Sequence, residues 1–240
     1  MNTLRKIYNN RCWITGIFLV ILLATSCKKD DYYLDTGTID PHYKGTILDY
    51  LKEKPFYFDS LVTIIQLAGM NDVFTKDTVT FFAPTDHSIQ NTVEILNVNL
   101  YALGKDTIKT LEDVPPEVWK KYLSIYLFKG ANELKDYPQI DFDLLRTYPG
   151  QNYLSYNNTV MNIGVVYGNA NDVKYVGYRQ LHLTYIDKPA QIMKAYTKAP
   201  VASSNIKPLN GVIHVLSDMH FFFGFSPFDF VNDYQIYKGE

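Results

Sequence analysis

The chain has 240 residues, and its 23 Lys and Arg nearly balance its 25 Asp and Glu, for a formal net charge of -2. With this balance the chain has no excess of basic residues, which argues against a nucleic-acid partner. A hydrophobic fraction of 47% with 20% charged residues excludes a disordered chain. The 20 Tyr and 14 Phe favour strands and recognition surfaces, so the composition also argues against an all-helical bundle.

The N-terminal segment predicts an export signal. Arg5, Lys6 and Arg11 precede an apolar run over residues 13–24, which at about a dozen residues is shorter than the roughly 20 that a membrane span needs. The run ends in Ala-Thr-Ser-Cys, which resembles a bacterial lipobox. We therefore expect a signal peptide over 1–26 and lipid attachment at Cys27, the alternative being ordinary cleavage nearby that leaves a plain thiol.

The residues after Cys27 predict where the protein is exported. Lys28, Lys29, Asp30 and Asp31 resemble the signal that sends Bacteroidota lipoproteins to the outer face of the outer membrane, although the same charges would suit a solvated tether over 27–43. We expect an outer-membrane protein that is lipid-anchored and faces the cell exterior. Because the only other cysteine is Cys12, the exported body can form no internal disulfide.

The first half of the exported chain is predicted to form helices around one strand. Apolar residues from Leu61 to Ala68 follow a helical spacing, with Asp59 or Ser60 as cap and Gly69 as terminator. Thr78–Ala83 is β-branched and aromatic and predicts a buried strand that ends at a proline.

Two further helices are expected. Thr85 can cap a helix that runs to about Leu96, and Pro115 and Pro116 open another with a broad apolar face.

Beyond Gly130 the apolar period changes to two. It predicts strands over 152–156, 160–165, 174–178 and 181–186, with a hairpin turn at Asn157 and Asn158, and a last strand over 212–216. Helices first and a β-meander later indicate the α+β class.

Two boxes carry a family resemblance. Residues 80–86, Thr-Phe-Phe-Ala-Pro-Thr-Asp, and residues 210–216, Asn-Gly-Val-Ile-His-Val-Leu, resemble the two signatures of fasciclin domains. The resemblance implies one domain over 44–220, a β-wedge or sandwich flanked by helices, with an adhesive role. His214, inside the second box, is expected to be a satisfied core histidine rather than a catalytic one.

The chain departs from that family in two ways. A Tyr-His pair that is associated with adhesion in fasciclin domains is replaced by Ile125 and Tyr126. The domain is also enlarged around 97–114 and 167–178, and large loops on a rigid scaffold are where binding usually resides.

No motif for catalysis or cofactor binding is found, so we expect no catalytic residue, metal or cofactor. Asp136, Asp141 and Asp143 could face a calcium ion but are more typical of a solvated acidic loop. Asp106-Thr107-Ile108 resembles an O-glycosylation signal of exported Bacteroidota proteins, which makes Thr107 a candidate modification site.

The segment 221–240 is rich in aromatic residues, which a monomer cannot leave fully exposed. It either packs back over the sheet or docks on a partner, and Phe228, Phe230 and Tyr234 are the candidate contacts.

Two functions remain open at this stage. The resemblance implies a non-enzymatic surface lipoprotein that serves adhesion or acts as an accessory of a starch-utilisation-type uptake complex, with an outer-membrane transporter, another surface protein or a glycan as partner. The alternative is a carbohydrate-active or other hydrolytic enzyme, which would need carboxylates converging in a cleft.

Overall fold

A computed structural model gives the structure of the protein and describes residues 40–186 and 196–239. Every helix and strand named here belongs to the unit Pro41–Glu240. Its helices and strands are mixed, which confirms the α+β class.

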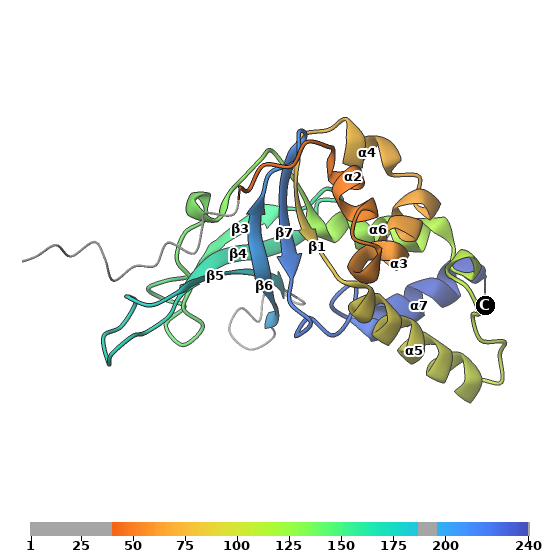
Figure 1. The fold of residues 1–240 in the computed structure, drawn as a ribbon. Coiled ribbons are helices and arrows are strands. Elements are labelled where there is room, and N and C mark those ends of the chain that lie inside the picture. Colours follow the sequence, from red (N-terminus) through yellow and green to blue (C-terminus); the bar gives the residue numbers. More distant parts are fainter. Residues whose placement is uncertain (1–39, 187–195, 240) are drawn as a thin grey trace, which may run out of the picture. The chain divides into compact units, whose positions relative to one another are not determined.

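Within the described residues, seven strands form one sheet in the order β2-β1-β7-β6-β5-β4-β3 (Figure 1). Their bounds are Val79–Ala83 (β1), Leu127–Lys129 (β2), Gln151–Leu154 (β3), Val160–Tyr167 (β4), Arg179–Ile186 (β5), Tyr196–Ile206 (β6) and Gly211–Leu216 (β7). β1 and β7 run parallel, with Phe81 beside Ile213, whereas the other neighbours are antiparallel. The two strands predicted from the boxes therefore lie side by side in one sheet, as expected.

The helices gather beside the β1 and β2 end of this sheet, away from the long β4–β5 hairpin (Figure 1). They are α2 (Ile47–Lys52), α3 (Pro55–Leu67), α4 (Asn71–Thr75), α5 (Asp86–Ala102), α6 (Pro116–Leu123) and α7 (Pro227–Lys238), and short 3₁₀ turns cover 111–113, 124–126 and 134–136. α2 begins with a reciprocal capping box between Thr46 and Asp49.

The hydrophobic core extends from the helices over β1, β2 and β7 to the buried residues of β4, β5 and β6. Phe74 of α4 packs edge-on against Phe81 of β1, with ring centroids 4.9 Å apart, and both side chains are completely buried. Phe58 and Trp119 are also fully buried. Each such aromatic stabilises the fold by about 1.5–3 kcal/mol relative to its exposed state.

The aromatic C-terminal segment packs back onto the same unit. Phe230 of α7 is fully buried against Trp119 and Tyr122 of α6, with ring centroids 5.3 and 4.9 Å apart, and α7 also packs along α5. Phe225 stacks on Tyr126 at 5.4 Å. The segment therefore covers the helices rather than mainly the sheet, which corrects the expected position.

Two local predictions need correction. Residues 174–178 form no strand. Tyr175 within this segment, and Asn171 and Asp172 just before it, adopt left-handed backbone angles that belong to turns. The helix after the first box continues to Ala102, about one and a half turns beyond the expected end. The predicted turn between β3 and β4 is confirmed, with Asn158 at φ 64°.

Candidate functional site

The first box forms the corner between β1 and α5, and its acidic residue reaches across to another helix. The Asp86 carboxylate accepts the backbone N–H groups of Ser60 at 3.1 Å and Leu61 at 3.0 Å. These N–H groups are free because Phe58 has a non-helical backbone (φ −137°) that divides α3 into two segments. Asp86 thus caps the second segment of α3 from outside, and the expectation that Asp59 or Ser60 caps it is wrong.

Thr85 has a different partner from the one that we predicted. Its hydroxyl donates to Asp218 Oδ1 at 3.3 Å and makes no capping bond to α5. Burial raises the pKa of the Asp86 carboxyl above its usual value, although the backbone N–H bonds from α3 oppose that shift. The corner is therefore built from side chains that join three separate parts of the chain.

A hollow of about 310 Å³ opens at this corner, next to the kink in α3. It is lined by Phe56, Tyr57, Thr85, Asp86, His87, Gln90 and Asp218. The Phe56 side chain is 86% exposed and Tyr57 52%, and their rings meet edge to face with centroids 4.9 Å apart. An exposed aromatic pair beside two carboxylates is the kind of surface that recognises a ligand.

The second box opens on an asparagine that ties the helices to the sheet. Asn210 Oδ1 accepts the backbone N–H of Ile47 at 2.8 Å, while its amide donates to the carbonyls of Phe74 and Asp77. A Cβ added at the next residue, Gly211, would lie 1.9 Å from the Val79 carbonyl oxygen. Only glycine fits this approach of β7 to β1, so both residues are architectural.

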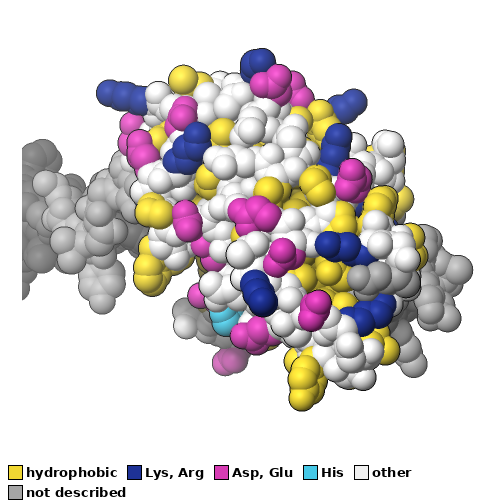
Figure 2. All heavy atoms as spheres, turned by 90° about the vertical axis from the view of Figure 1, so that its right-hand side faces the viewer, with side chains coloured by type: hydrophobic (Ala, Val, Ile, Leu, Met, Phe, Trp, Pro, Cys, Tyr) yellow, Lys and Arg dark blue, Asp and Glu magenta, His cyan; other side chains and the backbone are white. Residues whose placement is uncertain are grey.

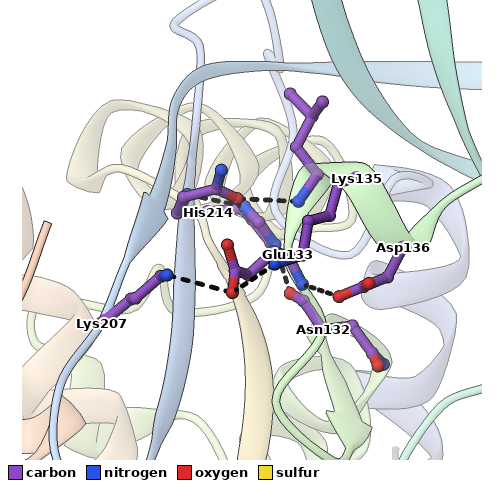
Figure 3. Close-up of polar contacts among 8 residues, drawn as sticks. Asn132, Glu133, Lys135, Asp136, Lys207 and His214 are labelled. Carbon is purple, nitrogen blue, oxygen red and sulfur yellow. Dashed lines mark hydrogen bonds and ion pairs between the residues drawn. The ribbon is translucent and has the colours of Figure 1, made fainter.

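His214 is a buried, fully partnered histidine, as predicted (Figure 3). Its Nε2 lies 3.0 Å from the Asn132 carbonyl oxygen, which can only accept, so Nε2 carries the hydrogen and donates. The Asn205 N–H donates to Nδ1 at 3.3 Å. Burial lowers the pKa of His214 to about 4, which keeps the ring neutral at physiological pH.

The loop of residues 132–136, which His214 contacts through Asn132, is held by further polar contacts (Figure 3). Asn205 Oδ1 accepts the backbone N–H of Leu134 at 2.7 Å, and Glu133 forms an ion pair with Lys207 at 3.0 Å. These contacts connect Asn205 of β6 and His214 of β7 to the residues at the 3₁₀ turn over 134–136. These hydrogen bonds and the ion pair therefore fix the loop to the sheet.

The position that corresponds to the adhesive Tyr-His pair lies inside the protein. Tyr126 is completely buried between Phe223 and Phe225, and its hydroxyl accepts the Gly224 N–H and lies 2.8 Å from His220 Nε2. Burial lowers the pKa of His220 to about 3, so the ring is neutral and a single hydrogen is shared between its Nε2 and the Tyr126 hydroxyl. Tyr126 therefore presents no surface to a partner.

The structure corrects the predicted partner contact at two of its three residues. Phe230 is fully buried and Tyr234 nearly so, because α7 packs against α5 and α6, and only Phe228 of the three is exposed, at 71%. Thr107 lies in the exposed loop after α5, which Asn97 holds through two hydrogen bonds to Ile108. Glycosylation of Thr107 stays a prediction.

The N-terminal predictions lie outside the described residues. They concern the lipid attachment at Cys27 and the export signal at Lys28, Lys29, Asp30 and Asp31, and the domain boundaries at 27, 44 and 221 likewise stay predictions. Among the described residues, no helix is long and apolar enough to span a bilayer.

Two of the three acidic loop residues use their carboxylates within the protein. Asp141 accepts the Tyr175 hydroxyl at 2.8 Å and the backbone N–H groups of Asp143 and Leu144, and the Tyr175 contact is the main cause of its lowered pKa. Asp136 accepts the backbone N–H of Glu133 at 2.8 Å. No group of three or more metal-ligating side chains gathers within the described part of the chain.

Comparison with known proteins agrees with the two boxes. The family model of the fasciclin domain matches residues 57–219. The chain belongs to the fasciclin domain family. Fasciclin domains are typically non-enzymatic adhesion domains. A search among curated proteins gave no match.

The solved structures that are similar to this fasciclin chain include a FAS1 domain pair from the insect cell adhesion molecule fasciclin I. The sequences are 16% identical, the TM-score is 0.45, and the match covers 72% of this chain. It covers 49% of that structure, so this chain spans about half its length.

Sequence reasoning missed the hollow at Phe56. The pair Phe56-Tyr57 follows Pro55 at the start of α3, where it continues no apolar stripe, and two adjacent aromatics off the stripe are a signal that could have been used. Asp218, by contrast, is about 160 residues away in sequence, and nothing local connects it to α3.

Proposed function

We propose that this chain is a non-enzymatic, surface-exposed outer-membrane lipoprotein whose fasciclin domain contacts other surface molecules. In this role it serves adhesion or acts as an accessory subunit of an outer-membrane uptake complex of the starch-utilisation type. The family supports a role without catalysis, and the lipobox that ends at Cys27 supports the anchor. The observation that carries the contact role is the exposed aromatic pair Phe56 and Tyr57 at the hollow.

Exposure of this pair carries weight because it is unfavourable in water. A Phe side chain that is 86% exposed forgoes most of the burial energy of about 1.5–3 kcal/mol that core aromatics gain. Aromatic residues of this kind are enriched among the anchors of protein interfaces. Figure 2 shows the surface on the helical side of the molecule, where apolar side chains are interspersed with charges of both signs.

The enzymatic alternative meets a difficulty at the same hollow. Asp86 and Asp218 both line it, and paired carboxylates are what hydrolysis of a glycosidic bond would need. However, each oxygen of Asp86 accepts a backbone N–H of α3, so this carboxylate is engaged in holding the fold together. Nothing in the described residues favours an acid and base pair here.

The lipid anchor is tested by metabolic labelling with a clickable fatty acid. Wild-type protein should incorporate the label, Cys27→Ala should lose it, and Cys12→Ala is the matched control that should keep it. Label that persists in Cys27→Ala would show that lipid is attached elsewhere or not by this route.

Surface exposure is tested with protease added to whole cells. Wild-type protein should be degraded, and a variant with Ala at Lys28, Lys29, Asp30 and Asp31 should stay lipidated but protected. Equal degradation of both proteins would mean that the charged run is only a tether.

The contact role is tested by photo-crosslinking on living cells. A photoreactive phenylalanine at position 57 should yield a defined product, whereas the same residue at position 101 serves as control, because Tyr101 is equally a surface tyrosine but lies outside the hollow. A product that contains an outer-membrane transporter supports the uptake role, and one that contains a neighbouring cell's surface protein supports adhesion. Identical products from both positions would argue against a specific contact at the hollow.

A further inference from the structure

We infer that the hollow between the start of α3, the start of α5 and the segment after β7 binds a basic side chain, arginine or lysine, of a protein partner. The inference rests on the proposed contact role and adds the chemistry of what is recognised. Its binding group consists of Phe56, Tyr57 and Asp218, which come from two distant parts of the chain.

The aromatic pair supplies the surface on which a cation can lie. The rings of Phe56 and Tyr57 are held edge to face at the N-terminal end of α3, where Pro55 fixes the first turn of the helix. Because both rings are exposed, a guanidinium or ammonium group can reach them without a change in the fold. Attraction between a cation and an aromatic face is favourable at exposed sites.

The charges of the hollow select the sign of the ligand. Asp86 and Asp218 line it, whereas no lysine or arginine does. Asp86 is engaged by the α3 backbone and offsets the partial positive charge at the start of α5. Within the described residues the Asp218 carboxylate accepts a hydrogen bond from the Thr85 hydroxyl alone, so it has room for a further donor.

His87 is oriented by a neighbouring donor on α5. Its Nε2 lies 3.2 Å from the side-chain amide nitrogen of Asn91. An amide nitrogen can only donate, so Nε2 is the acceptor in this contact. The same amide donates to the Phe221 carbonyl at 3.1 Å, which fixes its orientation. An anionic rim with an aromatic wall is thus complementary to a cation and gives a neutral sugar or an anion no such advantage.

The experiment measures peptide binding to the full-length protein in a non-ionic detergent. An arginine-bearing peptide is immobilised on a biosensor, beside the same peptide with citrulline, which keeps the shape and removes the charge. We expect binding to the arginine peptide that weakens with added salt, and binding to the citrulline peptide that is weaker by about tenfold or more, since charge-assisted hydrogen bonds are the stronger ones.

Matched variants locate the binding. Asp218→Asn should weaken the arginine peptide by about tenfold and Phe56→Ala by about two- to fivefold. Tyr101→Ala and Glu94→Gln remove an exposed ring and an exposed carboxylate elsewhere on α5 and should bind as wild type does. Melting curves of all four variants should match the wild type, because the substituted side chains are exposed or keep an acceptor for Thr85.

Several results would overturn the inference. These are absence of binding to the arginine peptide, equal binding of the citrulline peptide, and losses in Tyr101→Ala or Glu94→Gln as large as those in Phe56→Ala. Binding of a neutral malto-oligosaccharide that Phe56→Ala abolishes would assign the hollow to a glycan instead. None of these results touches the anchor, since fatty-acid labelling at Cys27 and surface protease access do not involve this hollow.

Discussion

Replacing Phe230 by Ala should destabilise the protein strongly, although Phe230 lies beyond residue 219, where the fasciclin match ends. The side chain is completely buried, and its ring contacts those of Trp119, Tyr122 and Phe223 with centroids 5.3, 4.9 and 6.5 Å away. Deletion of a buried Phe side chain costs about 3–5 kcal/mol, which is a large share of a total stability of about 5–15 kcal/mol.

Thermal unfolding of the full-length protein, followed by circular dichroism, measures this loss. At about 2–4 °C per kcal/mol for a domain of this size, Phe230→Ala should melt roughly 6–20 °C below wild type. The control is Phe228→Ala, two residues earlier on α7 and 71% exposed, which should melt within about 2 °C of wild type. Equal melting temperatures for the two variants would refute the packing of α7 on α6.

Three further predictions test the boxes. Asp86→Ala should lower the free energy of unfolding by about 1–3 kcal/mol in urea denaturation, because two N–H groups of α3 lose their acceptor, whereas Glu94→Ala should be neutral. Stability should fall as pH falls from about 6.5 to 4, because the His214 side chain gains a proton in the unfolded state there, whereas the buried ring stays neutral down to its pKa of about 4. His214→Gln should reduce this loss of stability by about 3 kcal/mol at most. Gly211→Ala should cost about 1–3 kcal/mol or prevent folding, as its Cβ would meet the Val79 carbonyl, and a wild-type urea midpoint would contradict this.

The parts of the fold that the sequence predicted are those with local physical signals. Pro84 cannot donate to a sheet, so it marked the end of β1, and the pair Asn157-Asn158 marked a turn because asparagine tolerates the left-handed backbone that Asn158 adopts. The boxes then placed β1 and β7 in one core sheet. None of these signals depends on a distant residue.

The parts that were missed depend on distant contacts or on mixed patterns. α7 carries Phe228 and Phe230 on opposite sides, so its aromatics follow no single helical stripe, yet Ser226 and Pro227 form a helix start that was available in the sequence. Alternating apolar residues over 174–178 imitated a strand, because period two does not reveal a left-handed turn residue such as Tyr175. The hollow was missed because one of its two carboxylates, Asp218, comes from a distant part of the chain.

The two boxes use their polar side chains to join distant elements, and this limits where recognition can occur. Asp86 gives its oxygens to α3, and Asn210 gives its whole amide to α2, α4 and the entry to β1. A side chain whose hydrogen-bonding capacity is used inside the fold cannot also bind a partner without loss of stability. Phe56, Tyr57 and Asp218 lie at the same corner outside the boxes, so changes there can alter binding while the fold stays intact. At this corner the residues that stabilise the domain are therefore different from those that can determine which partner it binds.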